Sequence, residues 1–108
     1  MATARDFMDR ANKRIEENKA QASTIGGVYK FVLHGDGGGT FIINLTDNPG
    51  VTEGEGAAQC TIKMSAKDYV DMIEGRADGR KLAFMGKLKI EGDLAAALKL
   101  QKISEMIR

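Results

Sequence analysis

The end of the chain constrains the fold most strongly, because a strand pattern is followed there by a helix pattern. Residues 87–91 alternate, with Leu88 and Ile90 on one side and charged side chains on the other, which is the period of a half-buried strand. Gly92 and Asp93 end this strand, and the Asp93 carboxylate can cap the helix that follows. We therefore expect an amphipathic strand and a C-terminal helix that pack on a common core.

This expected helix is apolar on two sides where it begins. At about 100° per residue, Leu100, Ile103 and Ile107 share one side. Leu94 and Leu98 lie nearly opposite. A helix with one apolar side needs one neighbour, whereas this one needs two. One neighbour should be the sheet, and the other is either a second helix or an apolar guest molecule.

The composition narrows the class of partner. The 108 residues are enough for one domain, 1–108, with one core. The 16 basic and 15 acidic residues nearly cancel, which removes the electrostatic reason to expect nucleic acid. The single cysteine, Cys60, cannot form an internal disulfide, and the chain lacks both a membrane-spanning apolar run and the apolar core of a signal peptide. A cytoplasmic location is therefore expected.

The first half of the chain predicts a helix and a hairpin. Residues 4–19 place their apolar side chains in one narrow stripe, which favours a helix that lies on the core. Residues 21–27 are expected to be a connector. Residues 27–45 alternate on both sides of the glycine-rich stretch 35–39, and this predicts a β-hairpin. The same glycines do not indicate a phosphate-binding loop, because that loop needs a Gly-Lys-Ser/Thr sequence that opens a helix.

Shorter patterns complete the predicted sheet. Residues 51–53 form a weak, short strand, and residues 58–64 alternate clearly with one buried face. Ser65 then caps a helix that ends near Gly75, and residues 81–85 form a short apolar turn. Strands with strict alternation indicate a sheet that is covered on one face, so the expected fold class is α+β with two layers.

Few residues could carry chemistry. A metal site needs histidine, cysteine or carboxylate ligands at suitable spacing, but the single His34 and the single Cys60 belong to different predicted strands. Cys60 falls among apolar positions, where a thiol is inert. The carboxylates lie near turns and helix ends, where capping and solvation explain them. We therefore expect neither an enzyme active site nor a metal or cofactor.

Flexible apolar side chains are frequent in the second half of the chain. Met64, Met72, Met85 and Met106 accompany several leucines. Methionine fills irregular core gaps, and its adaptable shape also suits apolar surfaces that accept varied partners. The pattern therefore leaves core filling and ligand binding as two interpretations.

Four motifs carry a resemblance to a known family. They are residues 25–31 (IGGVYKF), 60–64 (CTIKM), 84–93 (FMGKLKIEGD) and 97–101 (ALKLQ). From residue 25 to the end, the chain resembles the sterol carrier protein type-2 family. The resemblance implies a five-stranded, largely antiparallel sheet that is covered on one face by helices, with an apolar tunnel between the layers.

The resemblance also implies a function. Members of this family bind fatty acids, fatty acyl-CoA, phospholipids and sterols and assist their transfer between membranes, without catalytic machinery of their own. The expected partners are therefore a lipid or fatty acyl ligand, a membrane in transient contact and a lipid-metabolising enzyme. This chain lacks the peroxisomal C-terminal tripeptide of many animal relatives, and we expect a bacterial cytosolic protein. For such a protein an acyl lipid is a more natural ligand than a sterol.

The inward-facing apolar residues are the expected lining of that tunnel, although some of them must be plain core. They are Phe31, Leu33, Phe41, Ile43, Ile62, Leu88 and Ile90 from the sheet, and Met72, Ile73, Phe84, Leu100, Ile103 and Ile107 from the helices.

Two other functions compete with lipid carriage. In the first, the same apolar groove docks a partner enzyme or peptide, and any lipid is incidental. In the second, the chain is a small acyl hydrolase or isomerase, which would need a base near an apolar pocket. His34 is the only histidine that could supply this base.

Overall fold

The computed structural model describes residues 3–46, 48–93, 95 and 98–107 of the chain. The elements follow one another in the order α1 (Ala4–Glu17), α2 (Lys19–Ile25), β1 (Val28–His34), β2 (Gly39–Asn44), β3 (Gly50–Glu53), β4 (Cys60–Ser65), α3 (Ala66–Ile73), α4 (Gly79–Phe84), β5 (Lys89–Gly92) and α6 (Leu100–Ile107).

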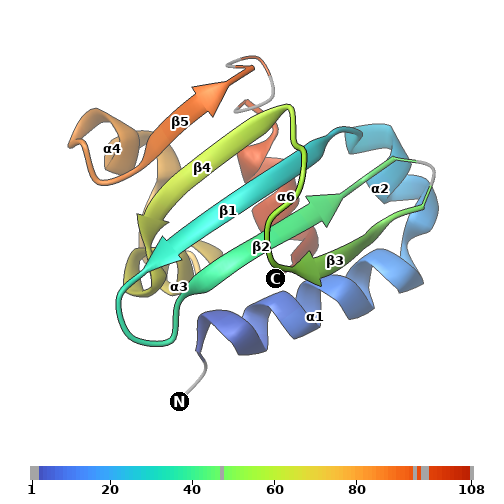
Figure 1. Cartoon of the computed structure of the whole chain (residues 1–108), viewed down its shortest axis with the longest axis horizontal. Coiled ribbons are helices and arrows are strands. Elements are labelled where there is room, and N and C mark those ends of the chain that lie inside the picture. The colour runs from blue at the N-terminus through green and yellow to red at the C-terminus, as the bar shows by residue number, and fades with distance from the viewer. Residues whose placement is uncertain (1–2, 47, 94, 96–97, 108) are drawn as a thin grey trace.

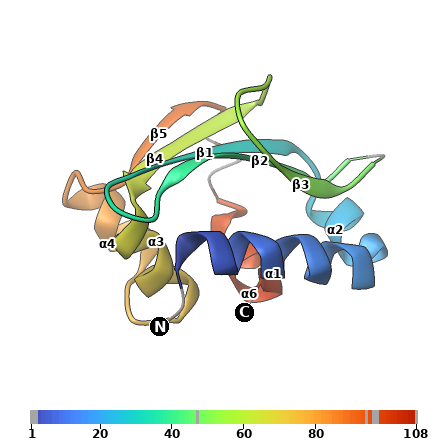
Figure 2. The same ribbon diagram turned by 60° about the horizontal axis from the view of Figure 1, so that its bottom comes forward.

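All five strands belong to one sheet in the order β3-β2-β1-β4-β5 (Figure 1). The pairs β1–β2, β2–β3 and β4–β5 are antiparallel, whereas β1 and β4 are parallel. Helices α1, α3 and α6 lie on one face of this sheet (Figure 2). The α+β architecture with a five-stranded, largely antiparallel sheet covered on one face is therefore confirmed.

Local alternation decides which side of each strand is buried. In β1, Tyr29, Phe31 and Leu33 are buried, and the side chains between them point to the opposite face. The strand register then builds a continuous apolar row, because Phe31 pairs with Phe41 in β2 and with Ile62 in β4. Ile62 in turn pairs with Ile90 in β5. This row crosses four strands and faces the helices.

The connection from β3 to β4 covers part of the opposite face. Figure 2 shows that it passes over the side of the sheet that carries no helix. Ile42 is buried on that side, and the backbone of Gly56 lies against the Ile42 side chain. The crossover therefore shields one outward apolar residue and brings β4 next to β1.

Polar side chains fix the ends of the helices and one edge of the sheet. Thr3 and Asp6 form a reciprocal capping box at the start of α1, with hydrogen bonds of 2.8 and 3.3 Å. Ser65 Oγ accepts a hydrogen bond of 2.9 Å from the Asp68 amide and so begins α3, as the sequence predicted. Asn12 Oδ1 of α1 accepts the amide of Val51 in the edge strand β3 at 3.0 Å, which ties helix to sheet.

Two segments differ from the expected connectors. Residues 21–27 were expected to lack helix, but most of them belong to α2, because Ala22 and Ile25 are buried on one helical face. The helix ends only at Gly26, whose φ of 71° favours glycine. Residues 81–85 are largely the helix α4 rather than a turn, since Asp78 caps that helix through the Arg80 amide at 2.9 Å.

The C-terminal helix also differs from the expectation. Asp93 Oδ1 accepts the amide of Ala95 at 2.9 Å, in agreement with a capping role. The side chain of Leu98 is 81% exposed, so it does not gain the expected second neighbour, and Leu94 lies outside the described residues. Leu98 and Lys99 form a turn, so α6 begins only at Leu100. The helix has one buried face.

Candidate functional site

The space between the sheet and the helices is filled by apolar side chains. Buried residues of α1, α3 and α6 and of the four strands β1, β2, β4 and β5 join a single hydrophobic cluster or pack against it. Apart from two tyrosines and one cysteine, the one buried polar residue among the described residues is Ser104 in α6, and no buried residue is charged. An interior without a charged group can accept hydrocarbon, but it offers nothing to hold an ionised head group.

Most of the predicted lining residues lie in this interior. Ile90 is only partly buried, at the end of the apolar row. The buried ones are Phe31, Leu33, Phe41, Ile43, Ile62, Met72, Ile73, Leu88, Leu100, Ile103 and Ile107. Their inward orientation is what the alternation and the helical periodicity predicted, whereas their contact with a ligand stays a prediction.

Phe84 does not face inward as predicted, because its side chain is 93% exposed. α4 buries only Leu82. Residues two positions apart in the sequence are separated by about 200° around a helix. A helix that turns Leu82 into the core must therefore turn Phe84 outward. The prediction treated 81–85 as an apolar turn and therefore missed this opposition.

Helix α1 contributes interior residues that the predicted lining omitted. Phe7, Met8 and Ile15 are buried, and their shared stripe in the sequence was the available signal. Tyr69 of α3 is also fully buried, with its ring 5.7 Å from that of Phe31 in an edge-to-face arrangement. These side chains come from separate elements and meet only in the folded chain.

The two buried tyrosines are the polar exceptions near the interior. The Tyr69 hydroxyl donates to the sulfur of Met8 at 3.6 Å, and burial raises the pKa of Tyr69. The Tyr29 hydroxyl donates to the carbonyl of Gly26 at 2.8 Å, and burial is the largest cause of its raised pKa. Both hydroxyls are therefore neutral at physiological pH and already partnered.

The candidate chemical groups do not form a catalytic arrangement. Cys60 is fully buried, and burial, followed by the charge of Asp93, raises the pKa of its thiol. His34 is exposed at the end of β1, opposite Ser65 of β4, whose hydroxyl caps α3. Over the described residues, no group of three histidine, cysteine or acidic side chains could hold a metal ion.

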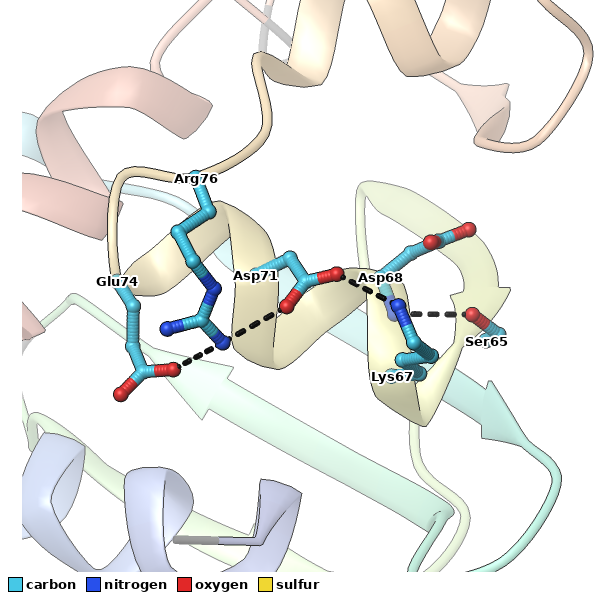
Figure 3. A network of polar contacts seen from close by, with 6 residues as sticks. All are labelled: Ser65, Lys67, Asp68, Asp71, Glu74 and Arg76. Atoms are coloured by element: carbon cyan, nitrogen blue, oxygen red, sulfur yellow. Dashed lines mark hydrogen bonds and ion pairs between the residues drawn. The ribbon is translucent and has the colours of Figure 1, made fainter.

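A polar network on the outer side of α3 is structural in character (Figure 3). Asp71 accepts hydrogen bonds from Arg76 at 2.8 Å and from Lys67 at 3.1 Å, and Glu74 pairs with the same arginine. The hydrogen bond with Arg76 is the largest cause of the lowered pKa of Asp71. The network ties the turn after α3 to the helix.

Two hollows lie on the surface. One runs along α1 and is lined by charged and amide side chains from Asp9 to Glu16. The other, with a volume of about 480 Å³, is lined by Asp78, Arg80, Lys81, Phe84 and Met85 at the end of α4. Neither is a tunnel between the layers, so the tunnel stays a prediction.

Comparison with known proteins identifies the family. The SCP-2 sterol transfer family matches residues 8–105, which include the sheet, α3, α4 and most of α1 and α6. This chain belongs to the SCP-2 sterol transfer family. The resemblance seen in the sequence motifs is therefore confirmed.

Two curated relatives of this SCP-2 chain are larger proteins. Hydroxysteroid dehydrogenase-like protein 2 of Xenopus laevis is 36% identical over 89 residues, which cover 80% of this chain and 21% of that protein. Sterol carrier protein 2 of Homo sapiens is 31% identical over 102 residues, which cover 90% of this chain and 19% of that protein. The chain thus spans about a fifth of the length of the curated relatives it matches.

A solved structure supports the fold of this SCP-2 chain. Sterol carrier protein 2 of Aedes aegypti, in complex with the C16 fatty acid palmitate, superposes with a TM-score of 0.78 and 19% identity over the whole of both chains. At this identity the likeness concerns the fold. None of the helices in the described part of the chain is long and apolar enough to cross a membrane.

Proposed function

We propose that this SCP-2 domain binds an acyl lipid between its sheet and its helices and assists the transfer of that lipid. The observation that carries the proposal is the apolar interior, in which the described residues place no charged side chain. Membership of a sterol transfer family supports it, and the Aedes aegypti relative of the same fold holds palmitate. The domain itself is proposed to be non-catalytic.

The energetics favour moderate and unselective binding. Burial of one methylene contributes about 0.8 kcal/mol, so a sixteen-carbon chain gains on the order of 12 kcal/mol. Association and immobilisation of the ligand oppose this gain by about 4–15 kcal/mol. These magnitudes leave at most about 8 kcal/mol of net binding energy, which corresponds to a micromolar affinity at best. An interior without charged groups recognises chain length rather than head group.

The interior can adapt to such a guest. Met8, Met64, Met72 and Met106 are all buried in the core. Their unbranched thioether side chains change rotamer at little cost and can rearrange around a hydrocarbon chain. The methionines are therefore proposed to let a closely packed core take up lipid.

The partners are proposed on the same grounds. The domain would collect its ligand from a membrane by transient contact and deliver it to a lipid-metabolising enzyme. The name of the Xenopus laevis relative and its greater length support an enzyme as that partner. Nucleic acid is not proposed, since the charges of the chain nearly cancel.

Native mass spectrometry of protein purified without detergent tests the proposal. We expect adducts at fatty acid or phospholipid masses, and lipid extraction of the same sample should identify the ligand class. Bare protein that also fails to take up a fluorescent fatty acid would contradict lipid carriage. That result would favour the docking of a partner enzyme or peptide instead.

A further inference from the structure

The turn between α4 and β5 presents two large apolar side chains to solvent. Phe84 is 93% exposed and Met85 is 61% exposed, although most large apolar residues of the described chain are buried. We call residues 78–89 the α4–β5 corner. In Figure 1 it lies at one end of the molecule, beside the outer strand β5.

Backbone hydrogen bonds close this corner, so its apolar tip is held in place. Leu82 and Leu88 are buried on either side of the tip. The carbonyl of Leu82 accepts the amides of Lys87 and Leu88 at 2.8 and 3.1 Å. Gly86 supplies the positive φ of 75° that the turn requires. Phe84 and Met85 are therefore presented outward by an anchored turn rather than by a loose loop.

The charge of the corner is strongly basic, although the whole chain is nearly neutral. Four basic residues, Arg80, Lys81, Lys87 and Lys89, share the corner with a single acidic residue, Asp78. All five are exposed, and Arg80 Nε lies 3.8 Å from the Asp78 carboxylate. Within the described residues, the three lysines have no ion pair. An excess of positive charge is thus available to an anionic partner.

The apolar and basic groups meet on one surface. The hollow of about 480 Å³ at the end of α4 is lined by Phe84 and Met85 together with Arg80, Lys81 and Asp78. An aromatic and a thioether side chain beside basic side chains match the boundary between lipid head groups and acyl chains.

We propose that the α4–β5 corner docks the protein reversibly on an anionic lipid bilayer. Phe84 and Met85 enter the head-group boundary, and the basic side chains contact anionic head groups. Two apolar side chains are too few for a stable protein interface, which needs about 800 Å² from each partner. They suit a transient contact with a membrane. The inference deepens the proposed function and rests on it, because a lipid carrier must meet the membrane that holds its ligand.

A single tryptophan can report on this contact, because the chain contains none. Phe84→Trp places the reporter at the tip, and we expect its emission to shift to the blue on phosphatidylcholine vesicles that contain phosphatidylserine. Gln21→Trp is the matched control in α2, at the opposite end of the molecule in Figures 1 and 2, and its emission should not change. A blue shift of the control alone would overturn the proposal.

Vesicle co-sedimentation then tests the side chains themselves. Phe84→Ser is expected to weaken partition onto the anionic vesicles by about tenfold. The double charge reversal Lys81→Glu and Lys87→Glu is expected to weaken it by about thirtyfold or more. Leu98→Ser removes another highly exposed apolar residue, outside the corner, and should bind as the parent protein does. The proposal is overturned if Phe84→Ser binds as well as the parent, or if neutral phosphatidylcholine vesicles bind equally well.

The inference and the proposed function can fail separately. Parent protein that takes up a fluorescent fatty acid, while Phe84→Ser sediments with vesicles as the parent does, refutes only the docking surface. Parent protein that takes up no acyl ligand, while Phe84→Ser loses vesicle binding, supports the surface and refutes lipid carriage. Loss of self-association in Phe84→Ser, with vesicle binding intact, would assign the corner to a second copy of the chain and overturn the proposal.

Discussion

At the scale of single residues, Ile62 lies in the middle of the apolar row, in the strand next to the central strand β1. It is fully buried in β4 and pairs with Phe31 on one side and Ile90 on the other. We predict that Ile62→Ala lowers the free energy of unfolding by about 2–5 kcal/mol, because it removes buried methylenes and leaves a cavity. Chemical denaturation measures this loss.

Ile90→Ala is the matched control for that substitution. Ile90 lies in the same apolar row but is only partly buried. Its truncation should lower the free energy of unfolding less than that of Ile62, because folding buries less apolar surface of the Ile90 side chain. Equal losses at the two positions would contradict a core centred between the sheet and the helices.

Asp71 gives the protein a small dependence of stability on acid. Hydrogen bonds with Arg76 and Lys67 hold the pKa of Asp71 below its usual value. A carboxylate with a lowered folded pKa stabilises the fold above its unfolded pKa, and this stability is lost as the pH falls through the folded pKa. We therefore predict that stability falls below about pH 4 and that Asp71→Asn reduces this fall.

Urea denaturation at several pH values checks the prediction for Asp71. Glu16→Gln, on the exposed side of α1, is the control, and it should leave the acid dependence close to that of the parent. An unchanged acid dependence in Asp71→Asn would show that the ionised Asp71 carboxylate in Figure 3 does not stabilise the fold.

At the scale of elements, the pairing of β4 and β5 depends on Gly92. Its φ is 94°, and a Cβ atom there would collide with the carbonyl oxygen of Gln59. That carbonyl also accepts the amide of Asp93 at 2.9 Å. We predict that Gly92→Ala destabilises the protein by more than about 2 kcal/mol, since a left-handed conformation and a backbone clash add together.

Gly86→Ala separates these two effects, and thermal or chemical denaturation of both variants makes the comparison. Gly86 also has a positive φ, of 75°, but a Cβ atom there would meet open space. Its substitution should cost only about 1 kcal/mol from the left-handed conformation. If both glycines tolerate alanine equally, the close approach of Gln59 does not limit the β4–β5 pairing.

At the scale of the whole molecule, the proposed function places a guest between two layers that are already packed together. Leu100 begins α6 on the buried side, and Leu98, two residues earlier, is 81% exposed. We predict that Leu100→Arg abolishes uptake of a fluorescent fatty acid, because it places a charge at the edge of the apolar interior. Titration of the ligand measures the loss, and circular dichroism verifies that the variant is folded.

Leu98→Arg is the matched control for the whole-molecule prediction. It introduces the same side chain outside the interior, so uptake should be retained. Binding that survives in Leu100→Arg would remove the start of α6 from the ligand site. Binding that disappears in both variants would point to the turn before α6 rather than to the interior.

Local sequence patterns were enough to predict the buried faces of β1, β2 and β4, the capped start of α3 and the family. Alternation and capping involve neighbours in the chain, so they can be read from residues such as Tyr29, Phe31 and Ser65 without knowledge of the fold. For the same reason, eleven of the thirteen predicted lining residues are buried, although their contact with lipid stays a prediction.

What those faces pack against depends on the arrangement of segments that are distant in the sequence. The parallel pairing of β1 with β4 depends on a crossover whose direction no local pattern encodes. The outward turn of Phe84 follows from the burial of Leu82, and Leu98 is exposed because no second neighbour reaches it among the described residues. An apolar side chain carries the same local signal whether or not a partner covers it, so its exposure is decided by how distant segments pack.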